Sequence, residues 1–325
     1  MADDLLLVGD VGATNARYAL ASTETGTYRD EQVLLCESFD SCEASIEHYL
    51  SHAGIADVRG ICLAVAGPVV DGKVIFPNNP WKVQEAELSA AFGDARALLI
   101  NDFAAVAMSL PLLSESDLIP IGEHPAARQW PGDYCVGVIG PGTGLGAAGL
   151  ICQGGSVARF ITEAGHVGFA PQTDLQVEVW RVLSNRFERV SNERVLSGQG
   201  LENILSALYE VYDKSDDLLQ AVEIFSLFGS NHLATQAVEM LFEILGQVAG
   251  DFALSVGAFD GIYFGGGILQ KHQELLLKSG LRQSFESKGR QRYIMESIPT
   301  RLITHPQPGL LGAVAFAAAE WAPLK

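Results

Sequence analysis

Short apolar runs alternate with glycine turns and helix-like segments along the first third of the chain. Residues 5–8 form an apolar run that ends in a Gly-Asp-Val-Gly turn, which is the pattern of a buried strand. A return strand is predicted at 18–22, and the spacing of apolar side chains predicts a helix at 41–52. Two more buried strands are predicted at 60–67 and 97–100. Strands that alternate with helices predict a sheet with parallel strands.

The same order of elements returns in the second half of the chain. A strand is predicted at 134–139, a glycine-rich turn at 140–146 and a return strand at 147–152. A last strand-like run at 261–264 leads into three consecutive glycines. The helices predicted in this half lie at 174–186, 200–212 and 232–256. Two halves that both open with strand, glycine turn and strand indicate an internal duplication.

The length of the chain predicts two domains. Its 325 residues exceed the roughly 250–300 at which one hydrophobic core usually splits. The proline- and acid-rich segment 111–131 marks the boundary. We expect a small α/β domain of residues 1–112 plus 306–325, and a large α/β domain of residues 113–305. The last helix, which starts near Gly309, is then expected to return to the first domain.

Composition and charge exclude several classes of protein. Hydrophobic residues make up 48% and charged residues 18%, which is a globular composition. The formal net charge is −18, so nucleic acid and anionic membranes are repelled and neither is expected as a partner. No apolar stretch approaches the roughly 18 residues of a membrane span, and the N-terminus lacks the basic and apolar regions of a signal peptide.

The cysteines indicate a reducing compartment. There are five of them, none of the spacings is CxxC, and four lie in apolar, strand-like runs. A reduced thiol in such a run behaves as a small hydrophobic group. The pattern argues against a disulfide framework or a zinc knuckle and predicts a cytoplasmic protein.

The first candidate for chemistry is the turn after the first strand. It contains Asp10, Gly12, Ala13, Thr14 and Asn15. The glycine allows a tight turn and close approach of a ligand, and the hydroxyl and amide beside it can donate hydrogen bonds. Asp10, at the end of a strand, can hold Mg²⁺ through water. An ordinary hairpin turn is the alternative, because Asp, Gly and Asn are common there.

The second candidate is the turn at 140–146, which reads Gly-Pro-Gly-Thr-Gly-Leu-Gly. Its glycines expose successive backbone N–H groups that can cradle phosphate, and Thr143 adds a hydroxyl beside Gly142 and Gly144. Residues 144–149 also spell GxGxxG, the dinucleotide fingerprint, which should open a helix. Here Gly154 and Gly155 follow too soon for a full helix, so a β-hairpin phosphate loop is favoured over a Rossmann turn. A glycine-rich hairpin without a ligand is the other alternative.

The third candidate is a pair of polar residues between a strand and a helix. Asn101 and Asp102 follow a strand and precede a helix, where they could cap the helix. A carboxylate there is also placed to take a proton from a substrate hydroxyl.

The fourth candidate is formed by Glu163, His166 and Glu193, which offer groups that suit a polyhydroxylated ligand. A metal site is less favoured, because no further Cys or His ligand follows nearby.

Together these segments resemble the bacterial glucokinase family of the actin-like ATPase and hexokinase superfamily. The motifs are DxGxTxxR from Asp10, NDF from Asn101, GPGTGLG from Gly140, EAGHVGF from Glu163, ERVLSG from Glu193 and FGGGI from Phe264. They occur in the family's order and cover nearly the whole chain. The resemblance implies an α/β, two-domain actin-like ATPase (ribonuclease H-like) fold with a duplicated mixed-sheet core and an interdomain cleft.

The resemblance also implies roles for the matching positions. Asp102 would be the general base toward the 6-hydroxyl of glucose. The residues implied as sugar contacts are Asn78, Asn101, Asp102, Glu163, His166 and Glu193. The residues implied for ATP and Mg²⁺ are Asp10, Gly12, Ala13, Thr14, Asn15, Gly142, Thr143 and Gly144, with Gly265, Gly266 and Gly267 on the adenosine side. A homodimer is a further expectation from the family.

One departure from a related family is informative. Repressor/kinase sugar kinases usually carry a cysteine-rich zinc motif after their Glu-x-Gly-His segment, whereas no cysteine follows His166 closely here. The pattern therefore resembles the zinc-free branch. Two other activities stay open: a kinase for another hexose or an N-acetylhexosamine, and a non-catalytic sugar-responsive regulator. An ADP- or polyphosphate-dependent variant is also open, although the motifs favour ATP.

Overall fold

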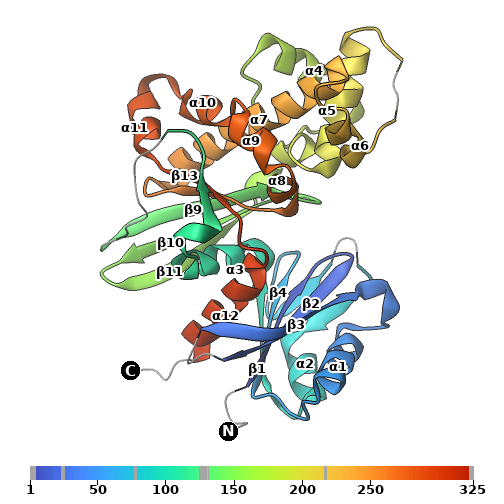
Figure 1. Ribbon diagram of the computed structural model, residues 1–325, viewed down its shortest axis with the longest axis vertical. Coiled ribbons are helices and arrows are strands. Elements are labelled where there is room, and N and C mark those ends of the chain that lie inside the picture. The colour runs from blue at the N-terminus through green and yellow to red at the C-terminus, as the bar shows by residue number, and fades with distance from the viewer. Residues whose placement is uncertain are drawn as a thin grey trace. The chain divides into compact units, whose positions relative to one another are not determined.

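The computed structural model describes residues 5–22, 26–76, 79–123, 130, 132–215 and 218–321. The chain divides into two compact units (Figure 1). The first unit comprises Met1–Ser114 and His305–Lys325, and the second comprises Glu115–Thr304. Each unit is built on its own mixed β-sheet, which confirms the predicted α/β fold with a mixed-sheet core in each half.

The first unit contains a five-stranded sheet in the order β3-β2-β1-β4-β7. Strands β1, β4 and β7 are parallel, and β2 and β3 complete an antiparallel meander with β1. The strands span Leu6–Val11 (β1), Asn15–Ser22 (β2), Thr27–Leu35 (β3), Gly60–Val65 (β4) and Arg96–Asn101 (β7). A two-stranded ribbon, β5 (Lys73–Ile75) with β6 (Lys82–Gln84), lies outside this sheet.

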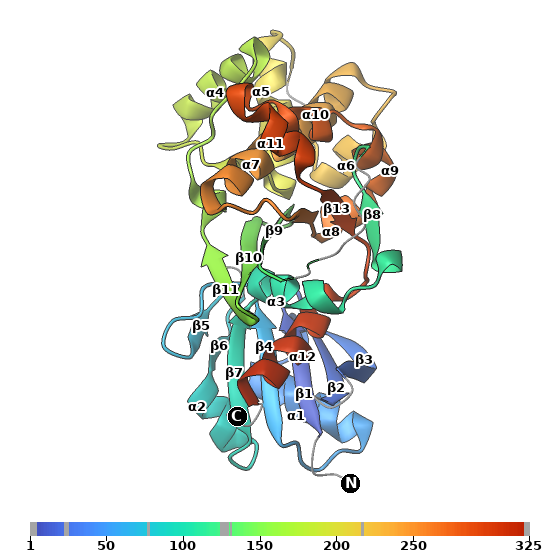
Figure 2. The same cartoon turned by 90° about the vertical axis from the view of Figure 1, so that its left-hand side faces the viewer.

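Helices cover both faces of this sheet. Side chains of α1 (Cys42–Ala53) and α2 (Glu85–Ala91) share one apolar cluster with one face. Those of α3 (Asp102–Ser109) and α12 (Pro308–Trp321) share another with the opposite face. Figure 2 shows α3 and α12 beside each other. A Cβ at Gly312 would overlap the Ala105 carbonyl, so the glycine sets how closely these two helices pack. The last helix, α12, thus packs within the first unit.

The second unit contains a six-stranded sheet in the order β11-β10-β9-β12-β13-β8. Strands β9, β12 and β13 are parallel, whereas β8, β10 and β11 each pair antiparallel. The strands span Leu118–Pro120 (β8), Tyr134–Pro141 (β9), Leu145–Gln153 (β10), Ser156–Thr162 (β11), Ile262–Phe264 (β12) and Thr300–Ile303 (β13). The meander β9-β10-β11 repeats the pattern of β1-β2-β3, as the predicted duplication requires.

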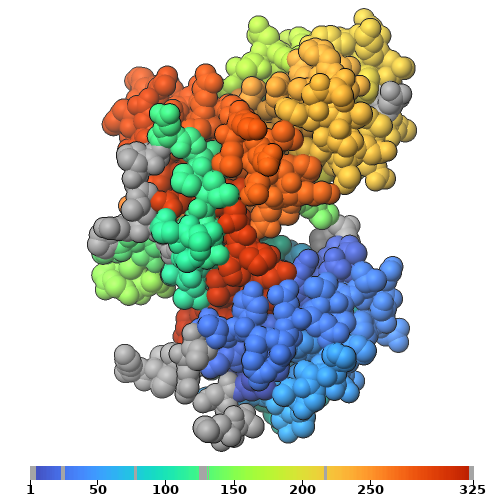
Figure 3. Space-filling model, viewed as in Figure 1, coloured from blue at the N-terminus to red at the C-terminus, as the bar shows by residue number. Residues whose placement is uncertain are grey.

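The helices of the second unit form one large apolar core with a face of this sheet. They span Asp174–Arg186 (α4), Gly198–Val211 (α5), Ala221–Ser226 (α6), His232–Val256 (α7), Gly267–Lys271 (α8), Gln273–Lys278 (α9), Leu281–Glu286 (α10) and Arg292–Ser297 (α11). The long helix α7 has the predicted bounds, and a Cβ at its Gly246 would overlap the Leu281 carbonyl of α10. In the space-filling view, the orange-to-red segments form much of this unit's visible face (Figure 3).

Two elements differ from the sequence-based expectation. Strand β2 begins at Asn15 and not at 18, which shortens the turn after β1 to a few residues. Strand β11 was not predicted, because most of its residues are exposed and its apolar positions do not alternate clearly with polar ones. None of the helices in the described ranges is both long enough and apolar enough to cross a membrane.

Candidate active site

In the first unit, the predicted residues lie at the carboxyl edge of the sheet. The parallel register aligns Asp10 of β1 with Ala64 of β4 and Ile100 of β7. The next row holds Val11, Val65 and Asn101. Asp10 and Asn101 therefore lie at the carboxyl ends of the two strands that flank β4, where parallel sheets commonly bind ligands.

Two backbone hydrogen bonds fix the turn between β1 and β2. The Gly12 N–H donates to the Asn15 carbonyl at 2.9 Å, and the Thr14 carbonyl accepts from the Cys36 N–H at 2.9 Å. Gly12 does not have a positive φ, and an added Cβ would meet only the Asn15 carbonyl oxygen, at 3.6 Å. The backbone therefore does not require glycine here, and close approach of a ligand stays the predicted reason for it.

Asp10 is partly buried beside a cation. Its Oδ2 lies 3.9 Å from an Arg17 guanidinium nitrogen. Burial raises the pKa of Asp10, and the Arg17 charge opposes that rise. A Cβ at Gly309, in the first turn of α12, would come within 3.1 Å of Oδ2, so the glycine leaves room for the carboxylate.

Asn101 and Asp102 have different roles at the start of α3. Asn101 is the N-cap: its Oδ1 accepts from the Ala104 N–H at 3.1 Å, and its Nδ2 donates to the Gly67 carbonyl at 3.1 Å. Asp102 lies in the first turn, where its Oδ1 accepts from the Phe103 N–H at 2.9 Å. Since Asn101 caps the helix, Asp102 is not needed for that role.

Asp102 has a strongly perturbed acidity. Burial is the main cause that raises its pKa to about 7, and the negative charge of Asp10 adds to the rise. Hydrogen bonds from neighbouring groups partly oppose it. A carboxyl group with a pKa near neutrality can both accept and release a proton at physiological pH, which is what a general base requires.

In the second unit, two glycine turns lie against each other at the corresponding edge. Strand β9 pairs in parallel with β12, and the Gly265 N–H donates to the Ile139 carbonyl at 3.1 Å. A Cβ at Gly140 would overlap the Gly265 carbonyl, and one at Gly266 would come within 2.6 Å of the Pro141 carbonyl oxygen. Gly266 also has φ +101°, which favours glycine. The turn at 140–146 and the turn at 265–267 are thus packed backbone to backbone.

A helix N-terminus completes this edge. The Gly198 N–H of α5 donates to the Gly142 carbonyl at 3.0 Å, and the Ser197 hydroxyl caps the helix by accepting from the Gly200 N–H at 2.9 Å. Helix N-termini and glycine turns both present N–H groups to anions. Sequence reasoning did not assign α5 to the site, although a Ser-Gly pair before an apolar periodic segment is an N-cap signal.

The predicted sugar residues of the second unit lie on two neighbouring short helices. Glu163 and His166 flank one 3₁₀ turn, and Glu193 lies on the other. Asn192 joins the two turns: its N–H donates to the Val167 carbonyl at 2.8 Å and its side chain to the Ala164 carbonyl at 3.0 Å. The three predicted side chains are therefore brought into one region of the unit.

These side chains differ in their contacts. Glu163 and His166 are exposed, at 69% and 63% of their side-chain surfaces, and their closest oxygen and nitrogen are 3.9 Å apart. Glu193 instead accepts the Leu145 N–H on Oε2 at 3.0 Å, and a Cβ at Gly144 would collide with its carboxylate. Glu193 therefore links the predicted sugar site to the glycine turn, a connection that the sequence did not indicate.

Asn78 lies outside the described residues. In the described parts of the chain, no three His, Cys, Asp or Glu side chains gather as a metal site. Mg²⁺ usually binds through one or two carboxylates, water and substrate phosphates. The partly buried carboxylate of Asp10, with the charge of Asp102 close by, fits that kind of donor set.

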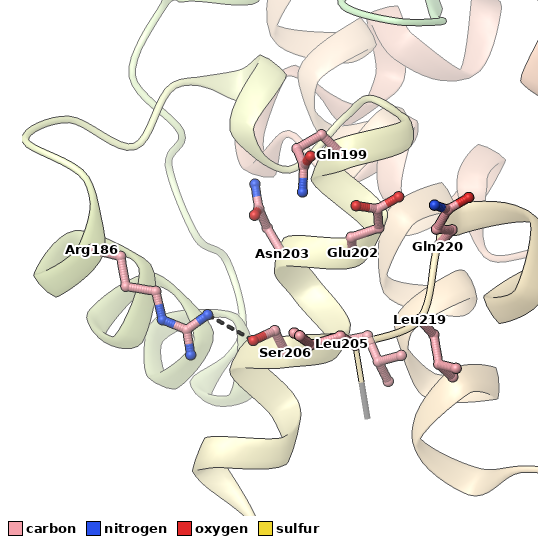
Figure 4. A pocket seen from close by; sticks show the side chains of 9 residues that line it. Arg186, Gln199, Glu202, Asn203, Leu205, Ser206, Leu219 and Gln220 are labelled. Atoms are coloured by element: carbon pink, nitrogen blue, oxygen red, sulfur yellow. Dashed lines mark hydrogen bonds between the residues drawn. The ribbon is translucent and has the colours of Figure 1, made fainter. Parts of the chain in front are cut away.

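The second unit also has a cavity of about 380 Å³ that contains none of the predicted residues. It lies between α4, α5 and the segment before α6 (Figure 4). Arg186 enters it and donates to the Ser206 hydroxyl at 2.8 Å and to Glu210 at 2.9 Å. Glu202 accepts the Ala221 N–H at 3.0 Å. The charged side chains that line the cavity, Arg186 and Glu202, thus already have partners within the protein.

Comparison with known proteins shows the family to which the chain belongs. The glucokinase family model matches residues 7–320. Glucokinases of Xanthomonas campestris pv. campestris and Stenotrophomonas maltophilia are 38% and 40% identical to the chain; each alignment covers 96% of this chain and 94% and 95% of those proteins. The crystal structure of a glucokinase from an Antarctic psychrotroph is 33% identical, with a TM-score of 0.85, and the match covers 96% of this chain and 98% of that one. The chain therefore belongs to the glucokinase family.

Proposed function

We propose that this protein is an ATP:D-glucose 6-phosphotransferase that uses Asp102 as its general base. The observation that carries the proposal is Asp102 itself, a carboxyl group at the carboxyl edge of the first sheet, with its pKa raised to about 7. Because Asn101 caps α3, this costly burial of a carboxylate has no purely structural explanation at the helix start. Family membership makes glucose and ATP the substrates to test first.

Each unit carries polar side chains that are proposed as sugar contacts. Asn101 uses one amide hydrogen for Gly67 and one lone pair for Ala104, and its side chain also hydrogen-bonds to Asp102, which leaves an acceptor for a sugar hydroxyl. The exposed side chains of Glu163 and His166 and the second carboxylate oxygen of Glu193 add further partners. Asn78 stays a prediction as a sugar contact.

ATP is held mainly by main-chain groups. In this proposal the turn Gly12 to Asn15 in the first unit and the turn Gly142 to Gly144 in the second each offer phosphate N–H groups and a threonine hydroxyl, Thr14 or Thr143. The N-terminus of α5 adds N–H groups beside Gly142. Gly265 to Gly267 form the adenosine-side turn.

The chemical step is one phosphoryl transfer. The 6-hydroxyl oxygen of glucose forms a bond to the γ-phosphorus while the bond from that phosphorus to the β–γ bridging oxygen breaks. The hydroxyl proton goes to Asp102, and ADP leaves with the electrons of the broken bond. Mg²⁺ held by Asp10 through water would offset phosphate charge when bound. The negative charge of Asp10, which lies beside Arg17, meanwhile adds to the rise in the pKa of Asp102.

A coupled ADP-release assay tests this function. Turnover is measured with ATP and a panel of D-glucose, other hexoses and N-acetylhexosamines, and with ADP or polyphosphate in place of ATP. Preferred turnover of glucose with ATP supports the proposal. Preference for another sugar identifies a related kinase, and sugar binding without turnover identifies a regulator; either result overturns it.

Location and assembly are parts of the same proposal. We expect the reaction in the cytoplasm, where ATP is present and where the five free thiols of the chain stay reduced. A homodimer is expected from the family, and sedimentation velocity of the purified protein tests it.

A further inference from the structure

A buried amide next to the predicted sugar loop reaches the predicted phosphate turn. Asn79 is only 7% exposed, which is unusual for a polar side chain. Its Nδ2 donates to the Gly12 carbonyl at 3.2 Å, and its Oδ1 accepts from the Trp81 N–H at 2.9 Å. Both ends of the amide are therefore used, one by the turn after β1 and one by its own loop.

Neighbouring groups hold this amide in place. Trp81 is 3% exposed, and its indole N–H donates to the Phe39 carbonyl at 3.2 Å. The Cys36 thiol also lies against the Gly12 carbonyl, with its sulfur 3.7 Å from the oxygen. Asn79 is thus anchored through Trp81, and the Gly12 carbonyl has two donors directed at it.

This arrangement fixes the direction of a peptide group. The Gly12 carbonyl and the Ala13 N–H belong to one planar trans peptide, so they point in opposite directions. While Asn79 holds the carbonyl toward the interior, the Ala13 N–H must point away from Asn79. That N–H donates to no backbone or side-chain acceptor among the described residues.

We propose that Asn79 is a positioning residue that aims the Ala13 N–H at a phosphate of the nucleotide. This inference rests on the proposed function, since it deepens the assignment of the turn to phosphate binding. Asn79 does not touch the substrate. It acts through the Gly12–Ala13 peptide, and without it the peptide can rotate so that its carbonyl oxygen faces the phosphate.

The main test is Asn79→Leu, which keeps the number and branching of side-chain heavy atoms but removes the hydrogen-bonding groups. Binding of ADP and of adenosine is measured by titration calorimetry, because only ADP carries phosphate. We expect the Kd for ADP to rise about tenfold, the effect of a lost hydrogen bond to a charged group, with little change for adenosine. Cys36→Ala should change the Kd for ADP in the same direction but less.

Trp81→Phe is the matched control. It removes the indole donor to Phe39 but keeps the Trp81 backbone N–H that Asn79 uses. This variant should lower the melting temperature without a selective loss of ADP binding. If Asn79→Leu does not fold, Asn79→Ser replaces it, since the shorter hydroxyl keeps a polar group in the site.

The outcomes separate this inference from the proposed function. Equal weakening of ADP and adenosine, or no change in either, overturns the role of Asn79. Selective loss of ADP binding supports it even if the wild-type protein proves inactive on glucose. Turnover of glucose by the wild type, with unchanged ADP binding in Asn79→Leu, would retain the function and reject the inference.

Discussion

The turn after β1 and the turn after β9 occupy equivalent places in the two units but are held by different chemistry. A buried neutral amide, Asn79, holds the first turn at the Gly12 carbonyl. A partly exposed carboxylate, Glu193, holds the second at the Leu145 N–H. In the first unit, the proposed sugar contact and the positioning residue are neighbours in sequence, Asn78 and Asn79. In the second unit, Glu193 is proposed to serve both purposes.

This difference shows where the two substrates are expected to be linked energetically. Glu193 has one oxygen on the phosphate turn, and its other oxygen is proposed to bind glucose. Its substitution should therefore affect both substrates. Asn79 contacts the phosphate turn directly and is not itself a proposed sugar contact, so its effect should fall mainly on the nucleotide.

Asp102→Ala is expected to have the largest effect, because it removes the proton acceptor itself. We expect kcat to fall by about 10²-fold or more. Asp102→Asn should lower kcat similarly while it stabilises the fold. The folded-state pKa of Asp102, about 7, is raised above the usual aspartate value of 3.8, so ionised Asp102 destabilises the folded state as pH rises through this range.

Both consequences are measurable on the same variants. Steady-state assays give kcat, and thermal melts at pH 8 should show a higher melting temperature for Asp102→Asn than for the wild type. Asp117→Asn, outside the proposed site, is the control for loss of an aspartate. Near-normal turnover of Asp102→Ala would remove this residue from the role of base.

Glu193→Gln tests the link between the two substrates. The substitution keeps an oxygen for the Leu145 N–H but removes the negative charge that strengthens both of its interactions. We expect kcat/KM to fall by about tenfold for glucose and to fall for ATP as well. Glu163→Gln is the matched comparison, because the exposed Glu163 side chain makes no hydrogen bond to the glycine turn in the described part of the chain, and it should affect the KM for glucose alone. Equal behaviour of the two variants would contradict the proposed link.

Substitution of a glycine in the turn at 140–146 can distinguish an effect on stability from an effect on nucleotide binding. An added Cβ at Gly142 would meet nothing within 4 Å, and its φ is not positive. Gly142→Ala should therefore change stability by less than about 0.5 kcal/mol. It should raise the KM for ATP about threefold or more if phosphate approaches this backbone, by loss of part of one hydrogen bond.

Gly144→Ala provides the contrast to that variant. Its Cβ would collide with the Glu193 carboxylate, so it should also raise the KM for glucose. Thermal melts and steady-state kinetics distinguish the two effects. An unchanged KM for ATP in Gly142→Ala would place the phosphates elsewhere.

The sequence indicated the elements of this comparison but not the contacts between them. Strand β1, helix α7 and the glycine turns follow from apolar periodicity and composition, which are local properties. The contact of Asn79 with Gly12 joins residues 67 positions apart, and that of Glu193 with Leu145 joins residues 48 apart. Such pairs depend on how the chain folds back, and neither residue type identifies its partner. The edge strand β11 was missed because it buries too few side chains to show a period.

The smallest expected effect concerns the charge shared by Asp10 and Asp102. Because the base must be ionised, kcat/KM for glucose should rise with pH through about 7 and level off above it. Asp10→Asn removes the negative charge that helps raise the pKa of Asp102, so this rise should move to lower pH. Burial, the larger cause, stays, so the shift should be smaller than the full displacement from 3.8. The pH profile of kcat/KM for glucose at saturating ATP measures it. A shift to higher pH would mean that Asp10 does not act on Asp102 through its charge, and the two carboxylates would then have to be treated as independent groups.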